Sequence, residues 1–201
     1  VADDADIRIK GKDHPWVSRG GQKLAHAISA FGLNAKHVHA IDVGASTGGF
    51  TDVLLHYGAE KVYAVDVGHG QLDWKIRQDA RVVVLEKTNA RYLTAELIPS
   101  LVDVVVCDAS FISLKTVLPA ALALTKPQSW LCALIKPQFE AGREHVGKGG
   151  VVKDPAIHQN VCDDIAAWVA GLEGWSVEGI TTSPITGPKG NIEFLIMAQK
   201  G

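Results

Sequence analysis

The chain has 201 residues, enough for one domain with a substantial core, and 47% of them are hydrophobic, which is ordinary for a globular protein. The formal net charge of −2 excludes a polycation, so a nucleic-acid partner would need a local basic surface. No apolar run approaches the roughly twenty residues that span a bilayer, and the acidic start of the chain does not resemble a signal peptide.

The cysteines and histidines indicate neither a disulfide framework nor a metal site. The three cysteines, Cys107, Cys132 and Cys162, are odd in number and widely spaced, and two of them lie in apolar runs. This usage is typical of reduced core cysteines, so we expect a cytoplasmic protein. The eight histidines form no HxxxH or Cys/His cluster, so we expect no metal.

The first half of the chain changes from a charged tail to alternating strands and helices. Residues 1–19 are charged and rich in turn formers, and alternating apolar and basic residues over 7–10 predict one short strand. Apolar residues at helical spacing predict a helix over Gly20–Phe31, which Gly32 ends. The expected strands that follow are 38–43, 62–65, 82–85 and 102–107, with a helix over 50–57 and a short one near Trp74.

The second half continues the alternation and then departs from it. Residues 114–124 predict a helix despite Pro119, and 130–135 a fifth strand. The glycine-rich segment 136–153 predicts a functional or mobile loop, followed by a long helix over 154–172. Two strands, 175–181 and 192–197, close the chain around a turn-rich loop. The pattern predicts a doubly wound α/β fold with a final antiparallel strand.

The segment 40–50 is the most informative motif. A short apolar strand ends in Asp42-x-Gly44, and Gly48 and Gly49 open the next helix. Glycines let the backbone approach a ligand closely, and amides at a helix start favour polar or anionic groups. Roughly twenty residues after Gly44 the next strand ends in Asp66, where an acid can accept hydrogen bonds from a ribose diol. Together they predict a nucleoside-cofactor site.

The same glycine turn leaves alternatives open. The dinucleotide fingerprint GxGxxG would need glycine at position 46, where this chain has Ser46. This departure weakens a nicotinamide-dependent oxidoreductase, which remains the alternative function. The other alternative is that the glycine turn is purely structural and binds no ligand. The other polar residues favour S-adenosylmethionine as the cofactor.

Polar residues also follow the later strands, where ligands bind in an open α/β sheet. Asp108 and Lys136 follow two strands and would meet if those strands pair, as catalytic groups or as a structural ion pair. A neutral lysine amine could take a proton from a ribose hydroxyl. Burial favours that neutral form, whereas an adjacent carboxylate favours the ammonium. Asn89, after the third strand, either contacts an adenine edge or caps its own loop.

Seven motifs occur together in chain order, from residue 18 to residue 193. They are Ser18–Leu24, Asp42–Phe50, Asp66–Leu72, Thr88–Arg91, Asp108–Ser113, Ile135–Glu140 and Gly187–Glu193. This set resembles the TlyA family, whose members are often called hemolysin A and belong with the FtsJ-like ribose 2′-O-methyltransferases. The resemblance covers nearly the whole chain from about residue 16.

The resemblance implies a seven-stranded Rossmann-like S-adenosylmethionine methyltransferase sheet over 20–201. It also implies four catalytic residues: Lys136 as base for the 2′-hydroxyl, Asp108 and Glu193 orienting the lysines, and Lys23 holding ribose or phosphate. The cofactor-binding residues expected from the motifs are Asp42, Gly44, Ala45, Ser46, Thr47, Gly48, Gly49, Phe50, Asp66, Val67, Thr88, Asn89 and Asp108.

The implied substrate is ribosomal RNA, alone or in a ribosomal subunit, with S-adenosylhomocysteine as by-product. Family members carry an N-terminal S4 RNA-binding domain, and we expect residues 1–19 to be its remnant or linker. The candidate phosphate-binding residues are Arg8, Lys10, Lys12, Arg19, Arg143, Lys148 and Lys189. A membrane-active toxin is suggested only by the hemolysin label, and the lack of a spanning segment argues against it.

Overall fold

The structure is a computed structural model and describes residues 13–201. The predicted strand over 7–10 and the candidate phosphate ligands Arg8, Lys10 and Lys12 lie outside the described residues. The strands are β1 (His39–Val43), β2 (Lys61–Val65), β3 (Val82–Leu85), β4 (Val102–Cys107), β5 (Thr125–Ile135), β6 (Trp175–Thr182) and β7 (Phe194–Lys200).

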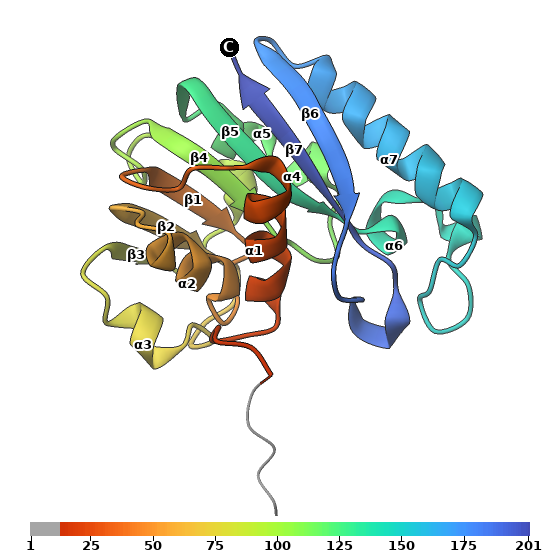
Figure 1. Cartoon of the computed structure of the whole chain (residues 1–201), viewed down its shortest axis with the longest axis horizontal. Helices are drawn as coiled ribbons and strands as arrows, with labels where there is room; N and C mark the ends of the chain where they lie inside the picture. Colours follow the sequence, from red (N-terminus) through yellow and green to blue (C-terminus); the bar gives the residue numbers. More distant parts are fainter. Residues whose placement is uncertain (1–12) are drawn as a thin grey trace, which may run out of the picture.

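These strands form one sheet in the order β3-β2-β1-β4-β5-β7-β6 (Figure 1). The pairs from β3 to β5 are parallel, and β7 is antiparallel to both β5 and β6. The α/β fold and the final antiparallel strand are therefore confirmed. The antiparallel direction brings the start of β7 to the edge where β4 and β5 end, because Phe194 pairs with Ile135.

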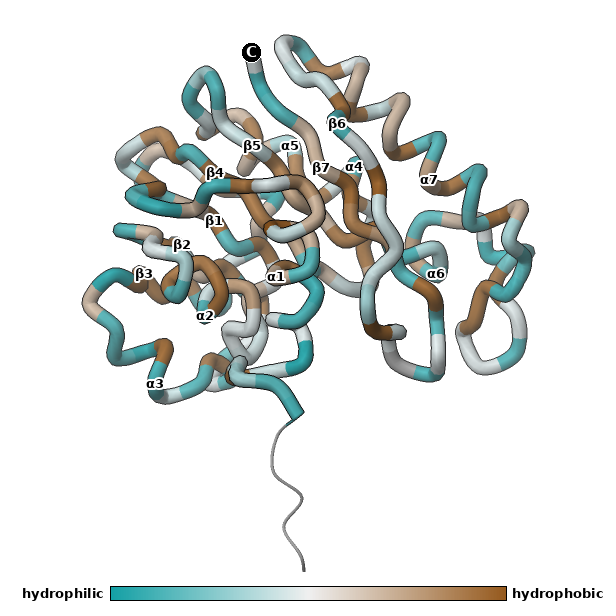
Figure 2. The backbone as a smooth tube through the Cα atoms, in the orientation of Figure 1, coloured by the Kyte–Doolittle hydropathy of each residue, from teal (hydrophilic) through white to brown (hydrophobic). Residues whose placement is uncertain are grey.

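Helices cover both faces of the sheet (Figure 1). Successive residues of β4 belong to different cores: Val104 packs on the side of the helices over 20–31 and 49–56, and Val105 on the side of the helices over 114–122 and 155–170. The hydrophobic residues in Figure 2 accordingly gather along the strands. The helices are α1 (Gly20–Phe31), α2 (Gly49–His56), α3 (Trp74–Arg77), α4 (Leu114–Val117), α5 (Pro119–Leu122), α6 (Pro137–Glu140) and α7 (Pro155–Ala170), with 3-10 turns η1 (Ala90–Tyr92), η2 (Arg143–His145) and η3 (Pro188–Gly190).

Three predicted elements differ from the structure by more than a shift of three residues at either end. The helix predicted over 114–124 is two short helices, because Pro119 begins α5 and Leu118 separates it from α4. The fifth strand begins at Thr125 rather than residue 130. The segment 136–153 is not all loop, since it contains α6, η2 and a bridge between Gly147 and Val151.

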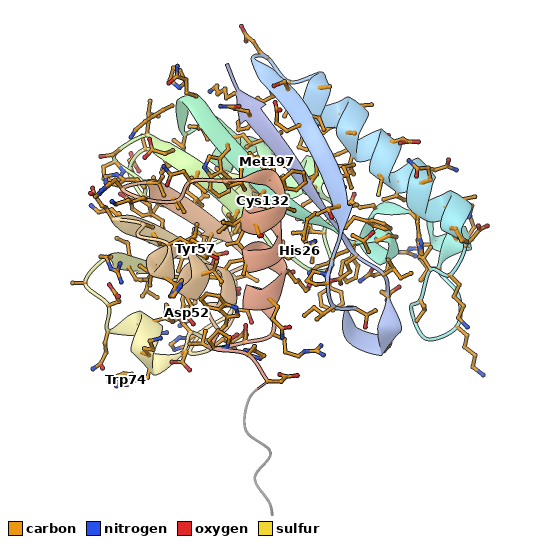
Figure 3. The ribbon with its side chains drawn as sticks, in the orientation of Figure 1. His26, Asp52, Tyr57, Trp74, Cys132 and Met197 are labelled. Carbon is orange, nitrogen blue, oxygen red and sulfur yellow. The ribbon has the colours of Figure 1, made fainter. Side chains whose placement is uncertain are left out.

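The three cysteines lie in the interior, as expected for core residues. Cys107, Cys132 and Cys162 are buried and free, and Cys132 pairs in register with Met197 across β5 and β7 (Figure 3). Among residues 13–201, no helix is long and apolar enough to cross a membrane. The same residues hold no group of three or more potential metal ligands.

Candidate active site

A cavity of about 800 Å³ opens at the carboxyl ends of β1, β4 and β5. Its walls are the turn after β1, the loop after β4, the start of α1, and two loops near residues 146–150 and 185–191. Its volume lies within the usual range for small-molecule sites. Apolar rings line it together with a few charged groups, a composition that suits a ligand with both apolar and polar parts.

Four charged side chains meet at this cavity and form one continuous series. Lys136 Nζ lies 2.6 Å from Asp108 Oδ1, and Lys23 Nζ lies 3.6 Å from Asp108 Oδ2. Lys23 Nζ also lies 2.8 Å from Glu193 Oε2. Lys23, Lys136 and Glu193 are buried, with 7%, 6% and 1% exposure. The expected contact between Asp108 and Lys136 is present because β4 and β5 are parallel neighbours.

Lys136 directly follows β5 and directs its amine at the loop after β4. Besides the Asp108 carboxylate, its Nζ donates to Asp108 O at 3.2 Å and to Ser110 Oγ at 2.9 Å. These three oxygens hold the amine in one place. A lysine held among oxygens beside a ligand cavity can transfer a proton at a defined position.

Glu193 comes from the other direction, immediately before β7. Its Oε1 accepts a hydrogen bond from Gln138 Nε2 at 3.3 Å while Oε2 faces Lys23. Gly187 lies directly over it. The φ of Gly187 is an ordinary −69°, but a Cβ there would collide with the Glu193 carboxylate. A glycine at 187 therefore lets the loop close over the buried acid.

Asn191 joins the two loops that form the outer wall. Its buried side chain accepts from Val152 N at 3.1 Å and donates to Gly150 O at 2.9 Å. Val152 O in turn contacts the ring of His158 on α7 at 2.9 Å. The glycine-rich loop and the loop before Glu193 are thus tied together, although the sequence indicated no such link.

The glycine turn after β1 is shaped by its close approach to the loop after β4. Gly44 has a φ of +81°, and a Cβ there would lie 2.9 Å from the backbone N and Cα of Ala109. Gly48 has a φ of +92° and precedes α2. Any other residue at 44 would push Asp108 away, because Ala109 directly follows it.

The expected cofactor residues divide into two groups. Those on the cavity wall are Gly44, Ala45, Ser46, Thr47, Gly49, Phe50 and Asp108. Those outside its lining are Asp42, Gly48, Asp66, Val67, Thr88 and Asn89. Cofactor binding by either group stays a prediction.

The residues after β2 and β3 form an edge beside the cavity. Asp66 Oδ2 accepts from Ser46 N at 2.8 Å and Oδ1 from Gly68 N at 2.6 Å, so the acid ties two turns together. Val67 is 70% exposed beside it. Thr88 Oγ1 donates to Glu86 O. The Asn89 side chain accepts a hydrogen bond from Arg91 N at 3.1 Å. It therefore caps its own loop, which is the second of the two roles that the sequence allows.

Asp42 lies beneath the glycine turn and is fully buried. Its Oδ2 accepts from Thr51 Oγ1 at 2.7 Å and Thr51 N at 3.0 Å, whereas Oδ1 has no hydrogen-bond partner among the described residues. Burial raises the pKa of Asp42 from 3.8 to about 7, against the Thr51 hydrogen bonds that lower it, and nearby Asp108 adds to the rise. Asp42 therefore anchors α2 from below the site.

This raised pKa predicts a pH-dependent stability. Between about pH 4 and pH 7 the unfolded state releases the Asp42 proton while the folded state keeps it, so the free energy of unfolding falls as pH rises. Asp42→Asn cannot titrate. Relative to wild type, the variant should gain about 4 kcal/mol between pH 4 and pH 8 in urea unfolding. A stability difference that does not change with pH would contradict the buried, protonated state.

Two aromatic residues at the cavity were not singled out from the sequence. Phe111 is 89% exposed and has a φ of +64°, and its ring centroid lies 4.9 Å from that of Phe139. Glu140 secures the loop beneath them: its carboxylate accepts from Ser113 Oγ at 2.6 Å and Leu114 N at 2.8 Å. The sequence signal for Phe111 is an aromatic residue three positions after Asp108, the acid that follows β4.

Comparison with known proteins agrees with this geometry. The family model described as FtsJ-like methyltransferase matches residues 16–200. YqxC of Bacillus subtilis, which carries an rRNA methyltransferase name, is 50% identical over 194 residues, covering 96% of this chain and 69% of that protein. The 16S/23S rRNA (cytidine-2'-O)-methyltransferase TlyA of Mycobacterium tuberculosis is 48% identical over 188 residues, covering 94% and 70%. Hemolysin A of Brachyspira hyodysenteriae is 44% identical, covering 90% and 75%.

Solved structures show the same architecture. A Streptococcus thermophilus protein named as a hemolysin is 47% identical with a TM-score of 0.90, covering 95% of this chain and 69% of that one. The O-methyltransferase from Bacillus cereus, solved in complex with SAH, has a TM-score of 0.61. It is only 16% identical over 94% of this chain and 84% of its own, so the likeness shows the fold alone.

Proposed function

The chain belongs to the FtsJ-like methyltransferase family, and we propose that it transfers a methyl group from S-adenosylmethionine to a ribose 2′-hydroxyl of ribosomal RNA. The observation that carries this proposal is the buried series Lys136–Asp108–Lys23–Glu193 at the wall of the cavity. Two lysines and two acids held this way suit proton removal from a weakly acidic hydroxyl. The relatives named as 2'-O-methyltransferases support the same substrate class.

The residues present fit an adenosyl cofactor. When bound, S-adenosylmethionine supplies an electrophilic methyl group on a sulfonium. The turn from Gly44 to Thr47 would hold its polar end, since it lines the cavity, carries two hydroxyl side chains and lets the backbone approach closely at Gly44. Asp66 would bind the cofactor ribose, because each oxygen of its half-exposed carboxylate can accept a further hydrogen bond.

Each of the four charged residues would have a different role at the acceptor ribose. Lys136 would accept the hydroxyl proton, and Asp108 would hold its amine and stabilise the ammonium that forms. Lys23 is paired on both sides and would present positive charge to the ribose or its phosphate. Glu193, almost completely buried, would hold Lys23 in place through their ion pair.

Surfaces beside the cavity fit a single-stranded RNA segment. Arg19 and Lys189 are exposed on its rim, and Arg143 and Lys148 are exposed on the adjoining loop. Arginines and lysines in such places contact phosphates without reading sequence. The exposed ring of Phe111 offers a face on which an unstacked base could lie.

The two alternatives have less support. The nicotinamide function was based on the glycine turn and Asp66, which the family membership assigns to a methyltransferase fold. The membrane-active function has a relative's name behind it, and no described helix could span a bilayer. Neither alternative accounts for the paired lysines and acids.

The test is to incubate the chain with methyl-labelled S-adenosylmethionine and excess ribosomal RNA or ribosomal subunits. We expect label in 2′-O-methylated nucleosides after nuclease digestion, and none on DNA of the same sequence, which lacks the hydroxyl. Calorimetry with S-adenosylmethionine and NAD in parallel should show binding of the first alone. Label found on bases, or preferential binding of NAD, would overturn the proposal.

A further inference from the structure

Ser110 lies beside Lys136 at the cavity wall, and both residues line the cavity. It lies two residues after Asp108 in the loop that follows β4, is exposed, and lines the cavity wall. Its Oγ accepts a hydrogen bond from Lys136 Nζ at 2.9 Å, whereas Lys136 itself is only 6% exposed. Ser110 is therefore the more exposed of these two neighbouring residues at the cavity wall.

Ser110 also differs chemically from the other partners of that amine. The three oxygens around Lys136 Nζ are Asp108 Oδ1, Asp108 O and Ser110 Oγ. A carboxylate and a carbonyl can only accept hydrogen bonds, but a hydroxyl carries a hydrogen and can also donate. No acceptor for the Ser110 hydrogen is found among residues 13–201. If Lys136 is neutral, Ser110 is the partner able to donate to its lone pair.

We propose that Ser110 relays the proton from the acceptor ribose hydroxyl to Lys136, an inference that rests on the proposed function. As the ribose oxygen bonds to the methyl carbon, the carbon–sulfur bond breaks and its electrons stay on sulfur, which becomes a neutral thioether. The 2′-hydroxyl proton passes to Ser110 Oγ, and the hydrogen already on Ser110 passes to Lys136 Nζ. Lys136 becomes an ammonium beside Asp108 and later loses this proton to solvent.

The test compares Ser110→Ala with Ser110→Thr under single-turnover conditions on ribosomal RNA. Ser110→Ala should slow methyl transfer by about a hundredfold, because the relay hydroxyl is lost, while Ser110→Thr keeps most of the rate. Rates in mixtures of H₂O and D₂O give a second readout. Two protons moving together predict a curved dependence on deuterium fraction in wild type and Ser110→Thr, and a linear one in Ser110→Ala.

Controls separate a relay from a merely structural role. Ser110 is exposed, so Ser110→Ala should unfold at the wild-type temperature and bind cofactor normally. Ser100→Ala, an exposed serine that precedes β4 at the other end of the strand, should leave the rate unchanged. A Ser110→Ala rate within twofold of wild type, or linear dependence in both proteins, overturns the relay alone. A wild-type chain that methylates no RNA overturns the proposed function itself.

Discussion

Lys136→Ala should reduce methyl transfer by about a thousandfold while leaving affinity for S-adenosylmethionine within about twofold of wild type. Lys136 is the base in the proposed reaction, and its amine contacts Asp108 and Ser110 rather than the glycine turn expected to hold the cofactor. Transfer of labelled methyl to RNA measures the first effect and calorimetry the second. Full activity in this variant would remove the assigned role.

Two further variants make this test specific. Lys136→Arg keeps the positive charge but cannot lose a proton near neutral pH, so it should be nearly as inactive as the alanine variant. If Lys136 only held Asp108 by charge, arginine would restore much of the rate. Lys115→Ala removes a half-exposed lysine that pairs with Asp164 outside the cavity, and it should retain wild-type activity.

Glu193→Ala should lower the free energy of unfolding by about 3 kcal/mol as well as abolish activity. Glu193 is 1% exposed and, within residues 13–201, is the acid nearest to the buried Lys23 amine. Its removal leaves Lys23 with Asp108, at 3.6 Å, as its remaining ion-pair partner in that part of the chain. Urea unfolding followed by tryptophan fluorescence measures the loss. A change below about 0.5 kcal/mol would mean that Lys23 finds another partner or reaches water.

Removing both charges should separate stability from catalysis. The double variant Lys23→Met, Glu193→Leu replaces the ion pair with apolar side chains of similar size, and such replacements often recover stability. It should therefore unfold near the wild-type midpoint yet stay inactive. Glu178→Ala, an exposed acid on the neighbouring strand β6, serves as the matched control and should change neither property.

The fold was largely predictable because its signals are local. Runs such as 102–107 and 130–135 are almost entirely apolar, as strands covered on both faces must be. Two predicted elements were wrong because the effect of a proline depends on its surroundings. Pro119 begins a second helix instead of lying within one, and Pro127 lies inside the longer strand β5, near Gln128 with its φ of +62°. The Leu- and Ala-rich sequence around Pro119 favours one continuous helix, and the polar residues at 126–129 favour a turn rather than a strand.

The site was predictable only in part. The contact of Asp108 with Lys136 followed from strand ends at one sheet edge, and it is present. The roles of Lys23 and Glu193 do not follow from strand ends. Each resembles a surface residue in its own segment, and only the family resemblance indicates that it belongs to the site. Their burial depends on the antiparallel direction of β7 and on the packing of α1 against the sheet. Long-range placement of this kind leaves no local mark in the sequence, as with the Asn191 link between loops.

The position of β7 has a consequence for biosynthesis. Among the strands that the structure describes it comes last in chain order, yet it lies inside the sheet between β5 and β6 (Figure 1). During translation the earlier strands can begin to pair as they emerge, but the sheet keeps a gap beside β5 until Phe194–Lys200 has left the ribosome. Glu193 arrives with that same segment. A nascent chain or a terminated product that stops before Glu193 therefore lacks one acid of the series, and activity can arise only after Glu193 and β7 have been synthesised.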